Sequence, residues 1–150
     1  TYDLKNWYLY RGFDPLDVAE FDSPVTIDTI DRELTRLGHT VDRIGNLPDL
    51  VERLSRGDRW DLVFNIAEGL RGPSRESQIP ALLEAYGIPT TFGDSLCLAV
   101  SLHKGHAKHV VRGHGVRTAP FAVVETAHPH FPAPDLNYPL LAKPIAAGTG

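Results

Sequence analysis

An almost uninterrupted apolar run at residues 61–67 constrains the fold of this chain more than any other feature. The run reads Asp-Leu-Val-Phe-Asn-Ile-Ala and lacks the strict alternation of a strand with one face in water. It is typical of a parallel strand that helices cover on both faces. Apolar residues recur at helical spacing in residues 48–55 and 75–86, on either side of the run. The sequence therefore predicts an α/β fold.

A further helix is predicted over residues 24–37. Ser23 is a favourable N-cap, and Pro24 suits the first helical position because its fixed φ is already helical. Gly38 follows the last apolar residue and predicts the end of the helix.

Short strands are predicted at residues 39–44 and 88–92, where apolar and β-branched residues cluster between turn residues. The resulting alternation of strands and helices predicts a doubly wound, Rossmann-like parallel sheet over residues 1–93. Ligands of such sheets bind beyond the carboxyl ends of the strands.

The character of the sequence changes in residues 94–150, which we expect to form the start of a second domain. Residues 95–113 are predicted to be helical, in two pieces that meet near Leu102. Strands are predicted at residues 120–124 and 138–143.

Composition excludes several classes of function. The chain has 150 residues, of which 42% are hydrophobic and 23% charged, as in ordinary soluble domains. A net charge of −4 argues against a nucleic-acid surface, and no apolar stretch approaches the ~20 residues of a membrane span. The single cysteine, Cys97, excludes an internal disulfide and is expected to be a small buried residue. With no signal peptide, we expect a cytoplasmic protein.

Charged residues gather in the loop that follows the apolar run. Arg75 can clamp a carboxylate, and Glu68 or Glu76 can meet an amine. Glu20 precedes the first predicted helix, where its carboxylate could also hold an amino group. The alternative is an exposed loop in which these acids only offset the positive ends of helices.

Lysines and histidines give weaker signals. Lys143 ends a predicted strand just before a glycine-rich segment, a pattern that suits phosphate binding. Lys104, by pattern alone, is typical of a solvated helical lysine. His103, His106 and His109 could share a metal, but no nearby carboxylate or cysteine completes a shell, so no metal site is predicted.

Taken together, these segments resemble the D-alanine–D-alanine ligase family of ATP-grasp carboxylate–amine ligases. The central run, Val63-Phe-Asn-Ile-Ala-Glu68-Gly69 and onward to Lys104, is the most specific part. The similar stretches lie in matching order along nearly the whole chain, at residues 20–24, 63–69, 75–89, 102–104 and 142–150.

The resemblance implies roles for individual residues. It matches Glu20 to the glutamate that holds the ammonium of the first D-alanine, whereas substrate binding by Glu68, Arg75 and Glu76 is predicted from the charges of their loop. It places ATP on two lysines and on a loop that folds over its phosphates, which here are Lys104, Lys143, Gly148, Thr149 and Gly150. The family's magnesium-binding acids lie beyond residue 150.

The implied activity is ATP-dependent joining of two D-alanines through an acyl-phosphate, a step in the synthesis of peptidoglycan precursors for the cell wall. The expected partners are small amino acids, ATP and Mg²⁺, with a homodimer left open, and residues 1–150 alone are not expected to ligate. Glu68 stands where typical members have histidine, and the loop to Ser77 lacks their acidic pattern. Two alternatives therefore remain: an ATP-grasp ligase for other carboxylates and amines, and a non-catalytic α/β binding domain.

Overall fold

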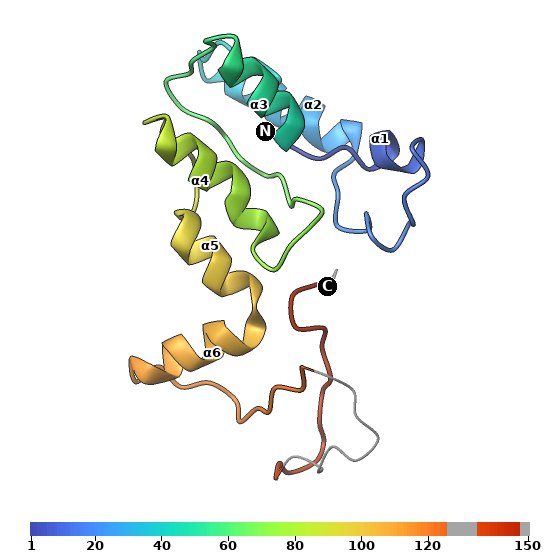
Figure 1. The fold of residues 1–150 in the computed structure, drawn as a ribbon, viewed down its shortest axis with the longest axis vertical. Coiled ribbons are helices and arrows are strands. Elements are labelled where there is room, and N and C mark those ends of the chain that lie inside the picture. The colour runs from blue at the N-terminus through green and yellow to red at the C-terminus, as the bar shows by residue number, and fades with distance from the viewer. Residues whose placement is uncertain (126–134, 148–150) are drawn as a thin grey trace.

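The computed structural model describes residues 1–125 and 135–147, and in this part of the chain it consists of helices joined by extended segments (Figure 1). The helices in chain order are α1 (Lys5–Leu9), α2 (Pro24–Arg36), α3 (Leu47–Ser55), the 3₁₀ turn η1 (Arg75–Ser77), α4 (Gln78–Ala85), α5 (Ser95–Leu102) and α6 (Lys104–Gly113).

Helix α2 begins and ends where the sequence predicts. The Ser23 hydroxyl accepts a hydrogen bond from the Thr26 amide at 3.3 Å, which satisfies one of the unpaired N–H groups of the first turn. Gly38 follows with a φ of 93°, a conformation that favours glycine. The predicted helix is confirmed.

Helix α3 has a stronger N-terminal signal than the sequence reading identified. The Asn46 side chain accepts from the Asp49 amide at 3.2 Å, and the Asp49 carboxylate accepts from the Asn46 amide at 3.1 Å. This reciprocal capping box orients the helix so that Leu50 and Leu54 are buried. Val51, the apolar residue between them in the sequence, is 50% exposed.

The predicted doubly wound parallel sheet is wrong. In residues 1–125 and 135–147 there is no strand, and the only pairings of that kind are two isolated parallel bridges, Leu4 with Asp22 and Val63 with Thr90. None of the strands predicted at 39–44, 61–67, 88–92, 120–124 and 138–143 forms.

Side chains interrupt the pairing that a sheet would need. The Val63 amide donates to the Pro89 carbonyl at 2.9 Å, and its carbonyl accepts from the Thr91 amide at 3.0 Å. At the next position the Asn65 amide donates to the Thr91 hydroxyl at 3.0 Å, not to a backbone carbonyl. The ladder therefore stops after one residue, and the segments stay extended without becoming strands.

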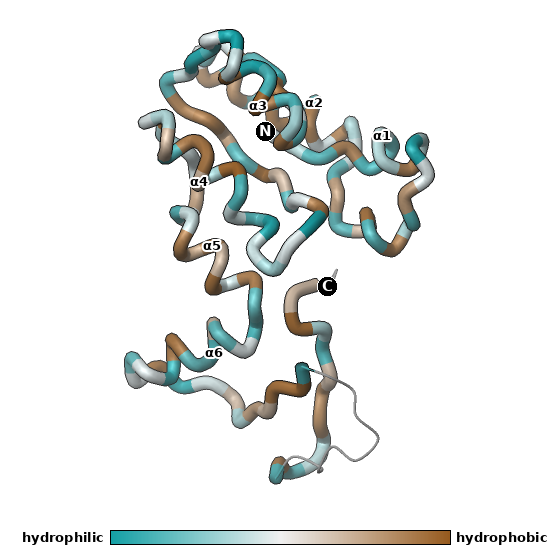
Figure 2. Tube along the Cα trace, in the orientation of Figure 1, coloured by the Kyte–Doolittle hydropathy of each residue, from teal (hydrophilic) through white to brown (hydrophobic). Residues whose placement is uncertain are grey.

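The main core forms where the extended run 61–67 crosses helices α3 and α4. Burial along this run alternates, with Val63 and Ala67 buried and Leu62 56% exposed, so the predicted burial on both faces is also wrong. Figure 2 shows the apolar stretch running between the two helices. The buried members of the cluster are Ile44, Leu50, Leu54, Val63, Ala67, Ile79, Leu83 and Ile88.

A smaller cluster anchors the first part of the chain. It comprises Tyr8, Val18 and Phe21, with Tyr8 contributed by α1, a five-residue helix that the sequence reading did not anticipate. The Tyr8 ring lies 4.7 Å from that of Phe21, between ring centroids.

The helical pieces predicted in residues 95–113 are confirmed as α5 and α6, which meet at His103. Cys97 on α5 is exposed, so the expectation of a small buried residue is wrong. Each helix within residues 1–125 and 135–147 is too short or too polar to cross a bilayer. The division into residues 1–93 and 94–150 stays a prediction.

Replacing Leu83 by alanine should destabilise the fold strongly, because its side chain is fully buried at the centre of the main core. We expect the free energy of unfolding to fall by about 2–5 kcal/mol, the usual loss for a buried leucine. Leu96→Ala is the matched control, since Leu96 is 72% exposed. Urea denaturation measures both variants, and equal losses would contradict this assignment of the core.

Candidate functional site

Five sequence-predicted residues converge on one cleft of about 440 Å³, here called the charged cleft. It forms where the loop after residue 67 meets the junction of α5 and α6 and the segment that returns from the C-terminal part of the chain (Figure 1). Its lining residues are Glu20, Glu68, Arg75, Glu76, Ser101, Leu102, Lys104, Ala146 and Ala147.

Arg75 connects the walls of the charged cleft. Its Nη2 donates to Glu20 Oε2 at 2.9 Å, and its Nη1 donates to the Ala146 carbonyl at 2.6 Å. Glu76 Oε1 lies 3.8 Å from the same guanidinium, whose side chain is only 14% exposed. The cation is therefore held in place and shielded from solvent, which strengthens its field in the cleft.

Lys104, the first residue of α6, contacts the same C-terminal segment. Its backbone amide donates to the Ile145 carbonyl at 2.9 Å, and its Nζ donates to the Ala147 carbonyl at 3.0 Å. The structure thus gives Lys104 a position beside the segment that precedes the glycine-rich sequence at residues 148–150. That position differs from the solvated helical lysine suggested by pattern alone.

The remaining predicted ATP residues are not gathered in the same way. Lys143 is exposed and does not line the charged cleft. Gly148, Thr149 and Gly150 lie outside the described residues.

Burial and neighbouring carboxylates raise the pKa of Glu68 to about 7. Desolvation is the largest cause, and the negative charges of Glu76 and Glu20 add to it, while Arg75 partly opposes the shift. A carboxyl group that titrates near neutral pH can accept a proton from an ammonium group or return one. A perturbed carboxyl in a cleft is also a common mark of a functional site.

A buried carboxylate that sequence reasoning missed supports the loop from behind. Asp3 is 3% exposed, and its Oδ1 accepts from the Tyr8 hydroxyl at 2.6 Å. Its Oδ2 accepts from the Gly69 amide at 3.0 Å, directly after Glu68. Asn46 Nδ2 donates to the Tyr8 oxygen at 3.3 Å and completes the network. A lone aspartate near the start of the sequence carries no pattern that would have revealed this role.

Gly69 is required where the loop turns. Its φ is 69°, and a Cβ at this position would lie 2.6 Å from the Arg75 carbonyl oxygen. Because that oxygen belongs to the backbone, it could not move aside cheaply. The close approach of Gly69 to Arg75 brings the two ends of the loop together, with Glu68 and Arg75 near the same cleft.

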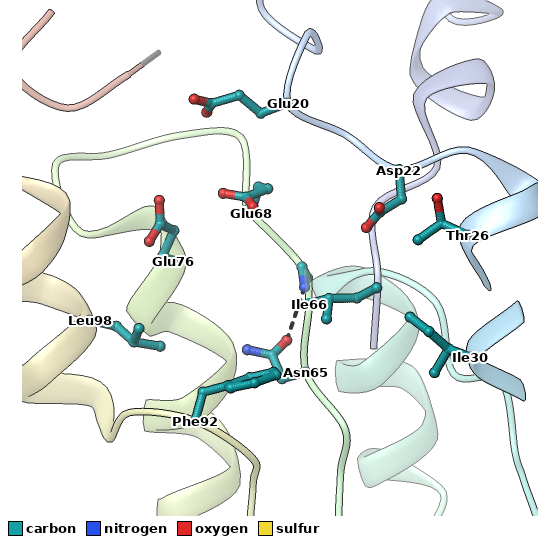
Figure 3. A pocket seen from close by; sticks show the side chains of 11 residues that line it. Glu20, Asp22, Thr26, Ile30, Asn65, Ile66, Glu68, Glu76, Phe92 and Leu98 are labelled. Carbon is teal, nitrogen blue, oxygen red and sulfur yellow. Dashed lines mark hydrogen bonds between the residues drawn. The ribbon is translucent and has the colours of Figure 1, made fainter. Parts of the chain in front are cut away.

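A second cleft of about 400 Å³, here called the mixed cleft, shares Glu20, Glu68 and Glu76 with the first (Figure 3). Figure 3 shows these carboxylates at one end, with Phe92 and Leu98 at the other. The other lining residues are Asp22, Thr26, Ile30, Asn65, Ile66 and Ala67. No basic side chain lines this cleft, in contrast to the charged cleft.

The histidines of α6 have structural contacts. His103 Nδ1 accepts from the His106 amide at 3.0 Å and caps the helix, and the two rings stack with centroids 3.8 Å apart. His109 packs against Phe121 at 4.9 Å between centroids. Within the described ranges no group of three histidine, cysteine, aspartate or glutamate residues could hold a metal ion.

Known proteins that are similar in sequence include several named D-alanine–D-alanine ligase. That of Methylorubrum extorquens (strain PA1) is 35% identical over 113 residues, which are 75% of this chain and 35% of the ligase. D-alanine–D-alanine ligase B of Xanthomonas campestris pv. campestris is 28% identical over 110 residues, 71% of this chain and 34% of the ligase. The uncharacterized protein y4sG of Sinorhizobium fredii is 33% identical over 97 residues, 65% of this chain and 27% of that protein.

The matches cover only 27% to 35% of the length of these relatives. No protein-family model matches the chain, and no solved structure matches it. The sequence is thus similar to D-alanine–D-alanine ligases over 60% to 75% of its own length.

The raised pKa of Glu68 predicts a pH dependence of stability. The folded state binds more protons than the unfolded state between about pH 4.5 and about pH 7, so the free energy of unfolding falls as pH rises through this window. Glu68→Gln removes this loss. The free energy of unfolding of the variant, relative to that of wild type, should therefore rise as pH rises across the window. We expect a rise of about 1 kcal/mol, less than the full pKa shift implies, because solvent screens a half-buried group.

Thermal or urea denaturation at about pH 5 and about pH 8 measures the difference. Glu84→Gln is the control, since Glu84 is an exposed residue outside both clefts. A constant difference between wild type and Glu68→Gln at all pH values would mean that Glu68 titrates normally.

Proposed function

We propose that this chain forms a substrate- and nucleotide-binding part of an ATP-dependent carboxylate–amine ligase. The similar proteins named D-alanine–D-alanine ligase support the reaction class. The observation that carries the proposal is the convergence in one cleft of Glu20, Glu68, Arg75, Glu76 and Lys104, which come from separate parts of the sequence. They combine anionic and cationic groups, the two kinds of partner that an amino-acid zwitterion requires.

The cations of the charged cleft suit anionic ligands. Arg75 presents a planar fork that matches a carboxylate, and Lys104 is a compact charge suited to phosphate oxygens. Their present hydrogen bonds to the Ala146 and Ala147 carbonyls show that each can reach an acceptor at the mouth of the glycine-rich segment. We propose that ligand oxygens take these donor positions, and that Lys143 reaches the nucleotide from the same segment.

ATP, when bound, would supply the phosphoryl group that activates the substrate carboxylate for attack by the amine. Lys104 and Arg75 fit such a group because they would offset its negative charge. Since the described residues contain no metal-binding group, we propose that the ligands of Mg²⁺ come from parts of the protein outside them.

The carboxylates are proposed to handle the amine. Glu20 and Glu76 lie beside the Arg75 cation, whereas Glu68 has a pKa of about 7 and can take the proton of a bound ammonium group at its carboxylate. Loss of that proton leaves the lone pair that would attack the activated carbonyl carbon. The C–N bond would form as the C–O bond to the phosphate breaks and phosphate leaves. In this scheme Glu68 is a base, a role to which its raised pKa is suited.

The names of the similar ligases make D-alanine one candidate for the substrates. Glu68, where typical members of that family have histidine, favours the alternative of another amino-acid pair.

A non-catalytic binding domain remains the competing function, and an assay of the full-length protein separates these three possibilities. With ATP, Mg²⁺ and a panel of D- and L-amino acids, we expect phosphate release coupled to dipeptide formation. Neither product with any pair would refute the proposal.

Reversal of the charge at Arg75 should impair amino-acid use. In Arg75→Glu the cleft loses its carboxylate clamp, so we expect the KM for the amino acid to rise about ten- to a hundredfold and that for ATP to rise less. Arg36→Glu is the matched control, since the Arg36 side chain is 70% exposed on α2. An unchanged KM for the amino acid in Arg75→Glu would remove Arg75 from the site.

Loss of Lys104 or Lys143 should instead impair ATP use. Each alanine variant loses one charge-assisted contact to phosphate, so we expect the KM for ATP to rise about tenfold or more. Lys108→Ala is the control, because Lys108 lies over the Phe121 ring at 5.0 Å and lines neither cleft. Steady-state phosphate release measures all three variants. If all three show the same ATP kinetics, the nucleotide site lies elsewhere.

A further inference from the structure

The mixed cleft contains a buried amide whose hydrogen-bonding capacity is only half used. Asn65 is 6% exposed, and its Oδ1 accepts from Thr1 Oγ1 at 2.7 Å and from the Ala67 amide at 3.2 Å. Because a backbone amide can only donate, the atom that it contacts must be the oxygen of the side chain. The nitrogen, Nδ2, is therefore placed on the opposite side.

Asn65 Nδ2 faces the cleft. Among residues 1–125 and 135–147, no group accepts a hydrogen bond from Asn65 Nδ2. In the same part of the chain, every side-chain N or O atom that is fully buried has a hydrogen-bond partner. Nδ2 is therefore not sealed within the protein, and Asn65 lines the mixed cleft. In Figure 3 it points away from the hydrogen-bonded oxygen, toward the side where Glu76 and Leu98 lie. Such a donor calls for an acceptor on a ligand.

The walls of the mixed cleft add two further requirements. The carboxylates of Glu20, Glu68 and Glu76 outnumber the one cation beside them, Arg75, which contacts Glu20 and Glu76 from the charged cleft. This end of the mixed cleft therefore favours a cationic group such as an ammonium. The opposite wall is apolar, and Phe92 at its mouth is 71% exposed, with its ring edge-on to Phe64 at 5.5 Å. An exposed aromatic ring beside a cleft gains contact area when an apolar group enters.

We propose that the mixed cleft binds an amino acid whose apolar side chain is larger than a methyl group. The ammonium group lies at the carboxylates, a carboxylate oxygen accepts from Asn65 Nδ2, and the side chain packs against Phe92 and Leu98. Asn65 and Phe92 are then the residues that determine specificity. As a statement about a ligase substrate this rests on the proposed function, but binding itself does not require the reaction.

The size of the cleft supports the larger side chain. Its volume of about 400 Å³ lies within the range of about 300–1,000 Å³ for small-molecule sites, and alanine would leave most of it empty. Leucine adds three carbons that can be buried against the apolar wall. We expect leucine to bind at least about tenfold more tightly than alanine of the same configuration.

Calorimetry on the full-length protein without ATP tests the proposal with leucine and alanine, each as D and L forms, and with 3-methylbutylamine, which is leucine without its carboxylate. Asn65→Asp keeps both structural hydrogen bonds to Oδ1 but removes the donor. This variant should lower the affinity for leucine about tenfold or more, and the affinity for 3-methylbutylamine should stay the same or rise. Asn6→Asp, on the exposed face of α1, controls for the added charge.

Equal affinities for leucine and alanine would overturn the proposal. So would an equal loss of affinity for leucine and for 3-methylbutylamine in Asn65→Asp. Should that variant fail to fold, Phe92→Ala decides, because its side chain is exposed. It should bring the affinity for leucine down to that for alanine, and retention of the preference would overturn the assignment. Leucine binding that depends on Asn65 in a protein with no ligase activity would refute the proposed reaction and leave this site standing.

Discussion

The guanidinium of Arg75 joins three parts of the chain that are far apart in sequence. It bonds to Glu20 ahead of α2 and to the carbonyl of Ala146, while its own backbone begins the turn η1. Without this cation, Glu20, Glu68 and Glu76 would repel one another across the same cleft. Arg75 therefore contributes both to the position of the C-terminal segment, which Lys104 also contacts, and to the pKa of Glu68, which it lowers against the other causes.

The loop that carries Arg75 is itself held by buried contacts. Asp3 accepts from the Gly69 amide, and Gly69 approaches the Arg75 carbonyl so closely that no other residue fits without backbone movement. The Tyr8 hydroxyl donates to the Asp3 carboxylate and accepts from Asn46, which also caps α3. The main core is linked in this way to the geometry of the charged cleft. Such support from buried hydrogen bonds keeps site residues in place without a ligand.

Local signals in the sequence predicted the helices well and the sheet wrongly. Ser23 and Pro24 fix the start of α2, and the apolar spacing in α3 and α4 identifies Leu50 and Leu83 as core. The run at 61–67 looks like a strand by composition. Whether it pairs depends on its neighbours, and there Pro89 and the Thr91 hydroxyl limit the ladder to one residue. Asp3 and the reach of Asn65 toward the cleft depend on tertiary contacts that no local pattern encodes.

A crystal structure of the full-length protein with a non-hydrolysable ATP analogue and a bound amino acid tests the central claim most directly. If the charged cleft is the site, phosphate or carboxylate oxygens lie within hydrogen-bond distance of Arg75 and Lys104, in place of the Ala146 and Ala147 carbonyls, and the amino group of the ligand lies beside Glu68. Ligands bound elsewhere, with Arg75 still joined to Glu20 and Ala146, would contradict it.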